Sequence, residues 1–379
     1  MKVASFLYEN QDFTKEINKE QLQVREANLV IGFGASALVS NEVNYIKIRE
    51  KFPNATLAMA SSAGEIFDKE AFDNTISLIA IAFKDTKIAT SEVNIDYFEN
   101  SFDAGNALVT NLPKEDLKWI FVISDGGKVN GSELVKGINE ATESKILVTG
   151  GLAGDGAKFE KTFVGLNAVA TSGKVVAIGF YGDTLQVSHG SIGGWESFGL
   201  ERTVTKSDRN ILYEIDNKNV LDLYKTYLGK YAEELPGSAL LFPLSIKLKD
   251  KEDVIVRTIL SLDEQNQSMT FAGDIPNGSK VRFMKANFDK LIDAASDAAN
   301  HCLQMTEISP KLALLISCVG RKVILNNRID EEIEAVADIF NNNTLLTGFY
   351  SYGEISPLRP FSGCELNNQT MTITCLNER

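Results

Sequence analysis

The feature that most constrains the fold is a module that occurs three times along the chain. In each copy an apolar strand precedes an amphipathic helix, a second apolar strand ends in a glycine turn followed by an acid, and two more strands follow. The turns read SSAGE at 61–65, LAGD at 152–155 and SYGE at 351–354. Because strands alternating with helices are typical of α/β and α+β proteins, we expect repeated β-α-β-β-β modules. We expect packed, mainly antiparallel sheets covered by helices, as in an αββα sandwich of two layers.

The apolar patterns also predict where the strands lie. The first copy predicts strands at 29–33 and 56–61, then strands at 76–83 and 88–96 joined by a hairpin at 84–86. In the other copies the two strands that flank the helix are expected at 119–124 and 145–149, and at 312–317 and 345–350.

The division into domains is expected between the second and third copies. A helix is predicted at 217–228, and a polar stretch rich in helix breakers follows at 233–237. A chain of 379 residues is long enough for two domains. We therefore predict one domain at 1–215 and another at 216–379.

Charge and hydropathy exclude several classes of partner. The chain has 38 Lys and Arg residues against 51 Asp and Glu residues, a net charge of −13, which repels nucleic-acid phosphates and anionic lipid. The N-terminus lacks the apolar core of a secretory signal, and no apolar run approaches the roughly 18 residues of a membrane-spanning helix. We expect a cytoplasmic protein that binds no nucleic acid and does not insert into membranes.

Motifs for catalysis and metal binding are missing. The four cysteines form no C-x-x-C pair, no G-x-S-x-G motif occurs, and the glycine-rich stretches fit neither a dinucleotide nor a phosphate loop. We expect a protein that is not an enzyme and has no metal site and no required cofactor. Two alternatives stay open: a haem sensor with His189 or His301 as axial ligand, Cys318 being a less favoured donor, and a hydrolase on a two-sheet sandwich.

Two kinds of charged residue are candidates for ligand binding. Glu65, Asp155 and Glu354 follow the glycine turns, at the rim of a sheet, although such acids can also serve only to cap the turn. Arg257 and Arg321 occur among apolar strand residues, where a guanidinium needs a carboxylate from the protein or from a ligand. An internal ion pair or an outward-facing side chain is the alternative for each arginine.

Several blocks of sequence together resemble the FIST family of sensory modules. The resemblance covers about residues 20–376, although Asn367 stands where the family pattern leads us to expect a histidine. The blocks lie, in family order, at 61–66, 150–155, 194–199, 223–229, 242–244, 256–257, 271–278, 318–321 and 352–355.

The resemblance implies a function in intracellular signal transduction. Relatives are thought to sense small molecules, amino acids being one proposal, and some resemble haem-binding nitric oxide sensors. Their signals pass to a histidine kinase of a two-component system, a chemoreceptor or a cyclic-nucleotide enzyme. We expect a small-molecule ligand between the two halves, with an arginine on its carboxylate and Glu65 or Glu354 on its ammonium group. The candidate ligand-binding residues are Ser62, Glu65, Asp155, Arg257, Cys318, Arg321, Tyr352 and Glu354.

Overall fold

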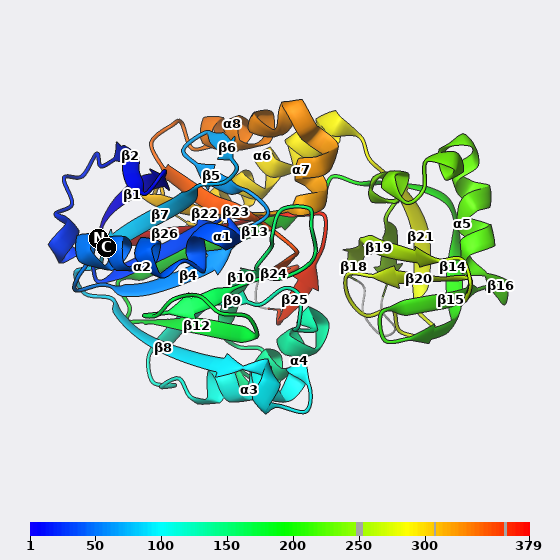
Figure 1. Ribbon diagram of the computed structural model, residues 1–379, viewed down its shortest axis with the longest axis horizontal. Helices are drawn as coiled ribbons and strands as arrows, with labels where there is room; N and C mark the ends of the chain where they lie inside the picture. The colour runs from blue at the N-terminus through cyan, green and yellow to red at the C-terminus, as the bar shows by residue number, and fades with distance from the viewer. Residues whose placement is uncertain (248–252, 307, 360–361) are drawn as a thin grey trace.

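The protein consists of a large body and a smaller lobe, seen at the left and right of Figure 1. The structure is a computed structural model, and it describes residues 1–379 except 248–252, 307 and 360–361. The body contains three six-stranded sheets, and the lobe contains an eight-stranded one. Among the described residues, no helix has both the length and the apolar character needed to cross a bilayer.

Each body sheet is built on the same four-stranded unit, in which two parallel strands are followed by two antiparallel ones. In the first sheet the order is β4 (Thr56–Ser61), β3 (Leu29–Gly34), β7 (Ile76–Ala82) and β1 (Lys2–Glu9). In the second sheet the order is β10 (Leu147–Leu152), β9 (Leu117–Ser124), β12 (Lys174–Tyr181) and β8 (Lys87–Asn94). In the third sheet it is β23 (Leu345–Ser351), β22 (Leu312–Cys318), β26 (Met371–Glu378) and β13 (Leu185–Ile192).

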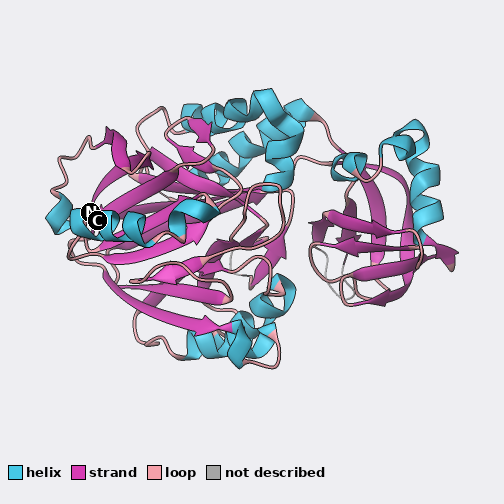
Figure 2. Cartoon of the chain, viewed as in Figure 1, coloured by secondary structure: helices cyan, strands magenta, loops and turns pink. Residues whose placement is uncertain are grey.

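Helices cover the outer faces of the three sheets (Figure 2). Most of their apolar side chains pack on the sheets, although Val43 and Ile46 of α2, which fall at helical spacing in the sequence, are exposed. Asparagine side chains cap the N-termini of most of these helices. The helices are α1 (Ser36–Val39) and α2 (Glu42–Lys51) on the first sheet, α3 (Ser101–Thr110) and α4 (Gly131–Ala141) on the second, and α6 (Phe288–Gln304) and α8 (Ile329–Ile339) on the third.

The inner faces of the three sheets share one hydrophobic core. Alternate residues of each strand point inward, and Phe33 of the first sheet stacks on Phe349 of the third with ring centroids 4.3 Å apart. Trp119 and Phe121 of the second sheet complete this core. The predicted α+β class, with repeated modules and helices outside packed sheets, is confirmed. The structure adds a third sheet to the two layers that we expected.

Each module also gives one segment to the sheet of another module. After its second parallel strand, the first module sends β5 (Glu65–Phe67) to pair with β23, and β6 (Glu70–Phe72) extends this edge. The second module sends β11 (Val164–Leu166) to pair with β4. The third sends β24 (Gly353–Pro357) to pair with β10, followed by β25 (Cys364–Asn367). The three sheets are therefore joined by a circular exchange of strands, and β2 (Asp12–Ile17) completes the outer edge of the first.

The expected hairpin at 84–86 is wrong. β7 pairs within the first sheet, whereas β8 pairs with β12 in the second. The connection is short, but it crosses from one sheet to the next, and the outer faces of the two strands pack under different helices.

The lobe, residues 196–285, is inserted between β13 and α6. Its first and last strands are neighbours, with Glu196 opposite Lys285, and it has a core of its own around Tyr224, Phe271 and Phe283. Its strands are β14 (Glu196–Asp208), β15 (Ile211–Ile215), β16 (Lys218–Asn219), β17 (Leu244–Lys247), β18 (Val254–Arg257), β19 (Ile259–Asp263), β20 (Ser268–Phe271) and β21 (Lys280–Lys285), with helix α5 (Val220–Leu228).

The predicted division of the sequence at 215/216 falls inside this lobe. Two of the three body sheets contain strands from both sides of that division. The predicted division into domains at 1–215 and 216–379 therefore follows the order of segments along the sequence, and it stays a prediction.

Candidate functional site

Two adjoining cavities lie between the body and the lobe. The polar cavity, of about 310 Å³, is lined by residues 126–131 of the body and by Asn210 and residues 271–273 of the lobe. The apolar cavity, of about 500 Å³, is lined by Pro236, Gly237, Leu240 and residues 258–260 of the lobe and by residues 318–320 and Val323 of the body. Both cavities share Phe159, Leu260, Ala272 and Tyr352. They open at the carboxyl ends of the parallel strands β9 and β22, where ligands often bind in sheets of this kind.

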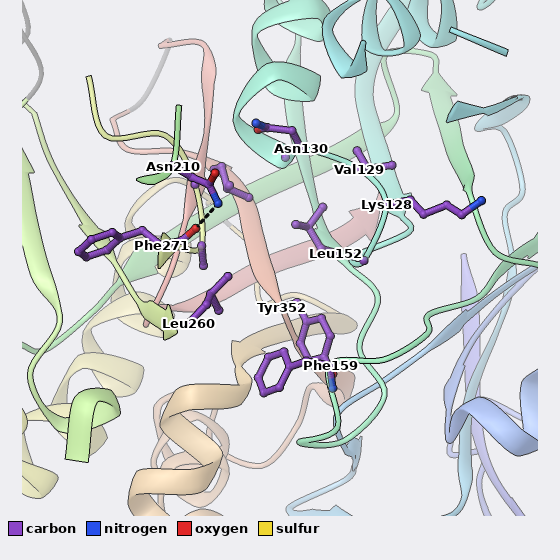
Figure 3. A pocket seen from close by; sticks show the side chains of 15 residues that line it. Lys128, Val129, Asn130, Leu152, Phe159, Asn210, Leu260, Phe271 and Tyr352 are labelled. Atoms are coloured by element: carbon purple, nitrogen blue, oxygen red, sulfur yellow. Dashed lines mark hydrogen bonds between the residues drawn. The ribbon is translucent and has the colours of Figure 1, made fainter. Parts of the chain in front are cut away.

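One buried carboxylate fixes the body side of the polar cavity. Asp125 accepts hydrogen bonds from the backbone N–H groups of Gly127 (2.8 Å) and Lys128 (2.7 Å), and on its other oxygen from Gly173 N–H (2.7 Å). The Lys128 side chain extends away from the cavity (Figure 3) to an ion pair with Asp96. The sequence analysis missed Asp125, although an acid that directly follows an apolar strand and precedes two glycines was a usable signal.

An aromatic pair separates the two cavities. The rings of Phe159 and Tyr352 stack with centroids 4.5 Å apart, and Leu260 of the lobe lies near them (Figure 3). The Tyr352 hydroxyl donates to Asp155 and accepts from the Phe159 N–H group (3.1 Å). Burial and the neighbouring Asp155 carboxylate raise the pKa of Tyr352 well above its usual value, so the phenol is neutral.

Asp155 holds the loop that carries Phe159. Its oxygens accept the backbone N–H groups of Phe159 (2.9 Å), Glu160 (2.8 Å) and Lys161 (2.8 Å). Phe159 has a φ of 57°, a conformation that is unusual for a bulky residue, and its side chain is 52% exposed. Phe159 was not a candidate from the sequence, because no pattern distinguishes it from other loop residues.

The two glutamates of the glycine turns are buried away from both cavities. Glu65 accepts from Ser62 (2.5 Å) and from Thr75 (2.8 Å), and burial raises the pKa of Glu65 to about 7. Glu354 accepts in the same way from Ser351 (2.6 Å) and Thr370 (2.9 Å), and burial raises the pKa of Glu354 to about 8. The two carboxyls therefore stabilise equivalent turns, the alternative that we had set against ligand binding.

Arg321 has an internal partner. It lies in α7 (Val319–Leu325) with no exposed surface, and its guanidinium donates to Glu332 (2.8 Å) and to the carbonyl oxygens of Gly193 (2.7 Å) and Leu291 (2.6 Å). The structure thus places an internal ion pair where we had also considered a ligand carboxylate. Arg321 lines neither cavity.

Arg257 fastens the lobe to the body. This buried guanidinium reaches from β18 to the carbonyl oxygen of Leu366 (2.8 Å) and to the Ser132 hydroxyl (3.5 Å), both in the body. Among the described residues it forms no ion pair, and burial lowers the pKa of Arg257 to about 10. It lies directly behind Gly273, where an added Cβ would come 2.7 Å from its Nε atom.

Of the candidates, the structure brings Cys318 and Tyr352 together on the apolar cavity, with Asp155 behind Tyr352. Cys318 ends β22, and burial raises the pKa of its thiol well above the usual value. Ser62, Glu65, Arg321 and Glu354 line neither cavity, and Arg257 lies behind the wall of the polar one.

The two histidines lie elsewhere. His189 of β13 is 5% exposed and lines a separate cavity of about 500 Å³, together with Leu147, Val187 and Met305. Burial lowers the pKa of His189 to about 4, and its Nδ1 atom is buried without a hydrogen-bond partner. His301 is exposed on α6. The described part of the chain contains no group of three or more His, Cys, Asp or Glu side chains arranged to hold a metal ion.

Comparison with known proteins assigns the family. The FIST N domain matches residues 28–218, and the FIST C domain matches residues 221–357. The chain belongs to the FIST family. FIST N and FIST C domains are sensory domains of signal transduction, and together they cover nearly the whole of this FIST chain.

Among curated proteins, this FIST chain is 25% identical over 231 residues to the uncharacterized protein MJ1623 of Methanocaldococcus jannaschii. That match covers 56% of the chain but only 42% of the relative. Among solved structures, the chain is similar to a cyanuric acid hydrolase from A. caulinodans, with 8% identity and a TM-score of 0.39 over 100% of this chain and 99% of that one. A second cyanuric acid hydrolase gives 8% identity and a TM-score of 0.37 over the same shares. TM-scores of this size do not establish a shared fold.

Proposed function

We propose that this FIST chain is a non-catalytic sensor that binds a small molecule between its body and its lobe. The observation that carries the proposal is the pair of adjoining cavities lined from both parts, with volumes of about 310 and 500 Å³. Small-molecule sites have volumes in this range and often lie between domains. The sensory role of FIST domains supports this assignment.

The lobe is attached in a way that suits a two-state response. The chain enters it after β13 and leaves it before α6, and polar contacts together with a small apolar cluster around Leu241 join it to the body. Asp274 of the lobe binds Asn130 (3.2 Å) and Lys136 (2.9 Å) of the body, near the bond from Arg257 to Leu366. A ligand that touches both walls of the cleft would favour one arrangement of lobe and body, and this difference in affinity is what shifts a population.

The recognition of an amino acid by Arg321 with Glu65 or Glu354 is not part of this proposal. Each of those side chains binds another residue inside the body, and a ligand in either cavity meets none of them. The partners are Glu332 for Arg321, Thr75 for Glu65 and Thr370 for Glu354. Arg257 would be reached only by displacing the backbone at Gly273.

Two observations support a role without catalysis. The Cys318 thiol in the apolar cavity stays protonated, because its pKa is raised by burial, and a thiol is a weak nucleophile. The residues that line the two cavities include no histidine to act as a base. The signal would pass to a separate effector, for which a histidine kinase, a chemoreceptor or a cyclic-nucleotide enzyme are the candidates.

The test is to look for a retained ligand by native mass spectrometry after incubation with a deproteinised cell extract. We expect an added small mass in the natural protein and in Val43→Trp, whose substitution is on the outer helix α2. We expect its loss in Val323→Trp, which fills the apolar cavity. Val43 and Val323 are 50% and 46% exposed, so the two variants are matched in exposure. A ligand that survives Val323→Trp, or no ligand in any form, would contradict the proposal.

Haem binding is a second candidate function, at a different cavity. His189 lines a cavity of about 500 Å³ with apolar neighbours, is neutral because burial lowers its pKa to about 4, and makes no hydrogen bond to a described residue through either ring nitrogen. A neutral, unbonded imidazole fits an axial ligand, although Lys118 and Lys145 also line this cavity, and haem iron there would supply a coordination position for nitric oxide. A Soret band after reconstitution that His189→Ala abolishes and His301→Ala retains supports this candidate. A band of equal height in both variants, or none in the natural protein, rules it out.

A further inference from the structure

We propose that the ligand of the apolar cavity is an uncharged molecule with an apolar body and a single hydrogen-bonding group. This assignment rests on the proposed function and adds the chemical class of the ligand. It departs from the zwitterionic amino acid that the sequence led us to expect.

The walls of the apolar cavity carry no charged side chain among the described residues that line it. The lining consists of apolar, glycine and alanine residues, with Thr258, Cys318 and Tyr352 as its polar members. Cys318 and Tyr352 are both neutral, because burial raises the pKa of each. A carboxylate or an ammonium group placed here would lose its hydration and gain no opposite charge, which strongly disfavours its binding.

Three exposed apolar side chains meet at this cavity. Phe159 is 52% exposed, Leu260 48% and Val323 46%. They come from a loop of the body, from β19 of the lobe and from α7, three segments that lie far apart in the sequence. Single exposed apolar residues are common on protein surfaces, but a group that lines one hollow marks a binding site for an apolar partner.

The Asp155 carboxylate behind the aromatic pair does not change this charge balance. Its two oxygens accept three backbone N–H groups and the Tyr352 hydroxyl. With these bonds made, it holds the loop of Phe159 and presents the ring of Tyr352, not a charge, to the cavity.

Thr258 supplies the position for the hydrogen bond. It lines the cavity, is 6% exposed, and its Oγ1 atom has no hydrogen-bond partner among the described residues. The carbonyl oxygen of Thr258 already accepts from the Ala272 N–H group (2.9 Å), so the side-chain hydroxyl is the group that lacks a hydrogen-bond partner among the described residues. A buried hydroxyl without a partner is unfavourable, and a donor or acceptor on the ligand would relieve this cost once rotation of the side chain turns the hydroxyl, which has almost no accessible surface, toward the cavity.

The experiment compares matched pairs of probes that differ in charge, by titration calorimetry on the full chain. Indole is compared with L-tryptophan, and p-cresol with L-tyrosine. We expect each uncharged probe to bind at least tenfold more tightly than its amino acid. We expect Thr258→Val to weaken the uncharged probes three- to tenfold, because a methyl group replaces the hydroxyl at nearly constant volume.

A charge in the wall provides the control for location. Leu260→Lys should weaken the uncharged probes at least tenfold, whereas Leu200→Lys, at a 72% exposed residue that lines neither cavity, should leave them unchanged. Equal binding by the amino acids, equal binding by the two lysine variants, or no binding of the uncharged probes would overturn the assignment. In each of these cases the proposed function still stands if Val323→Trp removes a ligand taken from the cell extract, so the two failures are distinguishable.

Discussion

Glu65 and Glu354 are glutamates with the same structural role at equivalent turns of two modules. Each carboxyl follows a glycine, accepts a serine hydroxyl from three residues before it and binds a threonine that directly precedes a strand of its own module, β7 or β26. In the second module Asp155 instead binds the loop of Phe159. Asp125 binds Gly173, the residue before β12, as the glutamates bind the threonines in the other modules. The glycine-acid turn has thus become a structural device in two modules and a support of the cleft in the third.

The raised pKa of Glu354 predicts a pH dependence of stability. Burial raises this pKa from 4.5 to about 8, so the unfolded chain releases the proton first as the pH rises. The contribution of Glu354 to stability is therefore complete below about pH 4.5 and is lost as the pH rises to about 8. We expect the free energy of unfolding, measured in urea, to fall less between pH 5 and pH 9 in Glu354→Gln than in the natural protein, by on the order of 3 kcal/mol.

Glu65 gives a second, independent part of this decline, since its pKa of about 7 is also raised. The double variant Glu65→Gln/Glu354→Gln should have the flattest profile, and Glu99→Gln, at an exposed position, should follow the natural protein. Parallel profiles for all four proteins would show that neither buried carboxyl is protonated in the folded state.

The ion pair of Arg321 with Glu332 predicts a strong and asymmetric effect of mutation. Both side chains are fully buried, so Arg321→Met leaves an unpaired carboxylate and should reduce the free energy of unfolding in urea by about 3–5 kcal/mol. Arg321→Met/Glu332→Gln should recover at least half of that loss. Arg328→Met, which breaks exposed ion pairs with Glu331 and Asp289, should cost much less than Arg321→Met. A loss in Arg321→Met no larger than in Arg328→Met would contradict the buried pair.

At the scale of elements, the parallel strands depend on close backbone contact at Gly348. A Cβ atom on this residue of β23 would come 1.8 Å from the carbonyl oxygen of Leu315 on the neighbouring strand β22. We expect Gly348→Ala to separate these strands and to cost at least about 3 kcal/mol, or to give no soluble protein. Gly237→Ala is the control, because a Cβ there meets nothing within 4 Å, and its urea midpoint should be unchanged. Equal midpoints for the two variants would contradict this strand packing.

The strands themselves were largely predictable, and their partners were not. The expected strands at 29–33, 56–61 and 312–317 agree with β3, β4 and β22 to within a residue, because apolar runs bounded by turn residues are a local signal. The hairpin at 84–86 was wrong because loop length does not reveal that β7 and β8 pair in different sheets. The sequence likewise predicts that Arg321 needs an anionic partner. It does not identify Glu332 as that partner, because the pairing depends on how α7 and α8 pack.

The candidate site was predictable only in part. Tyr352 and Cys318 belong to blocks of the family pattern and do line the apolar cavity. Phe159 and Leu260 contribute as much to it, yet each is an ordinary apolar residue in its own segment. They become a site only because the lobe brings β19 opposite the loop of Phe159, and that arrangement has no local sequence signal.

At the scale of the whole molecule, the lobe should be removable. Its first and last residues are strand partners, Glu196 opposite Lys285, so a short linker can join the chain across the gap. We expect a chain in which a glycine-serine linker replaces residues 196–285 to unfold cooperatively in urea, because the four body cores contain no lobe residue. It should no longer retain a small molecule.

The cost of this deletion should be modest. Leu241 of the lobe packs against Leu291, Ile324 and Leu325 of the body, and these side chains would become exposed. A protein without a cooperative transition, by circular dichroism, would show that the body depends on the lobe. Retention of the cleft ligand by the shortened chain would contradict a site between the two parts.

The circular exchange of strands also has a consequence for how the chain acquires its structure. The first sheet is completed by β11 of the second module, but the second sheet needs β24 and β25 of the third module, and β13 of the third sheet needs β26. Contacts between such distant residues make folding slow. Until these late strands are made, the edges of β10 and β13 lack their partners, and bare edges of this kind associate readily with other chains. The nascent polypeptide should therefore need chaperones most just before its last strand leaves the ribosome.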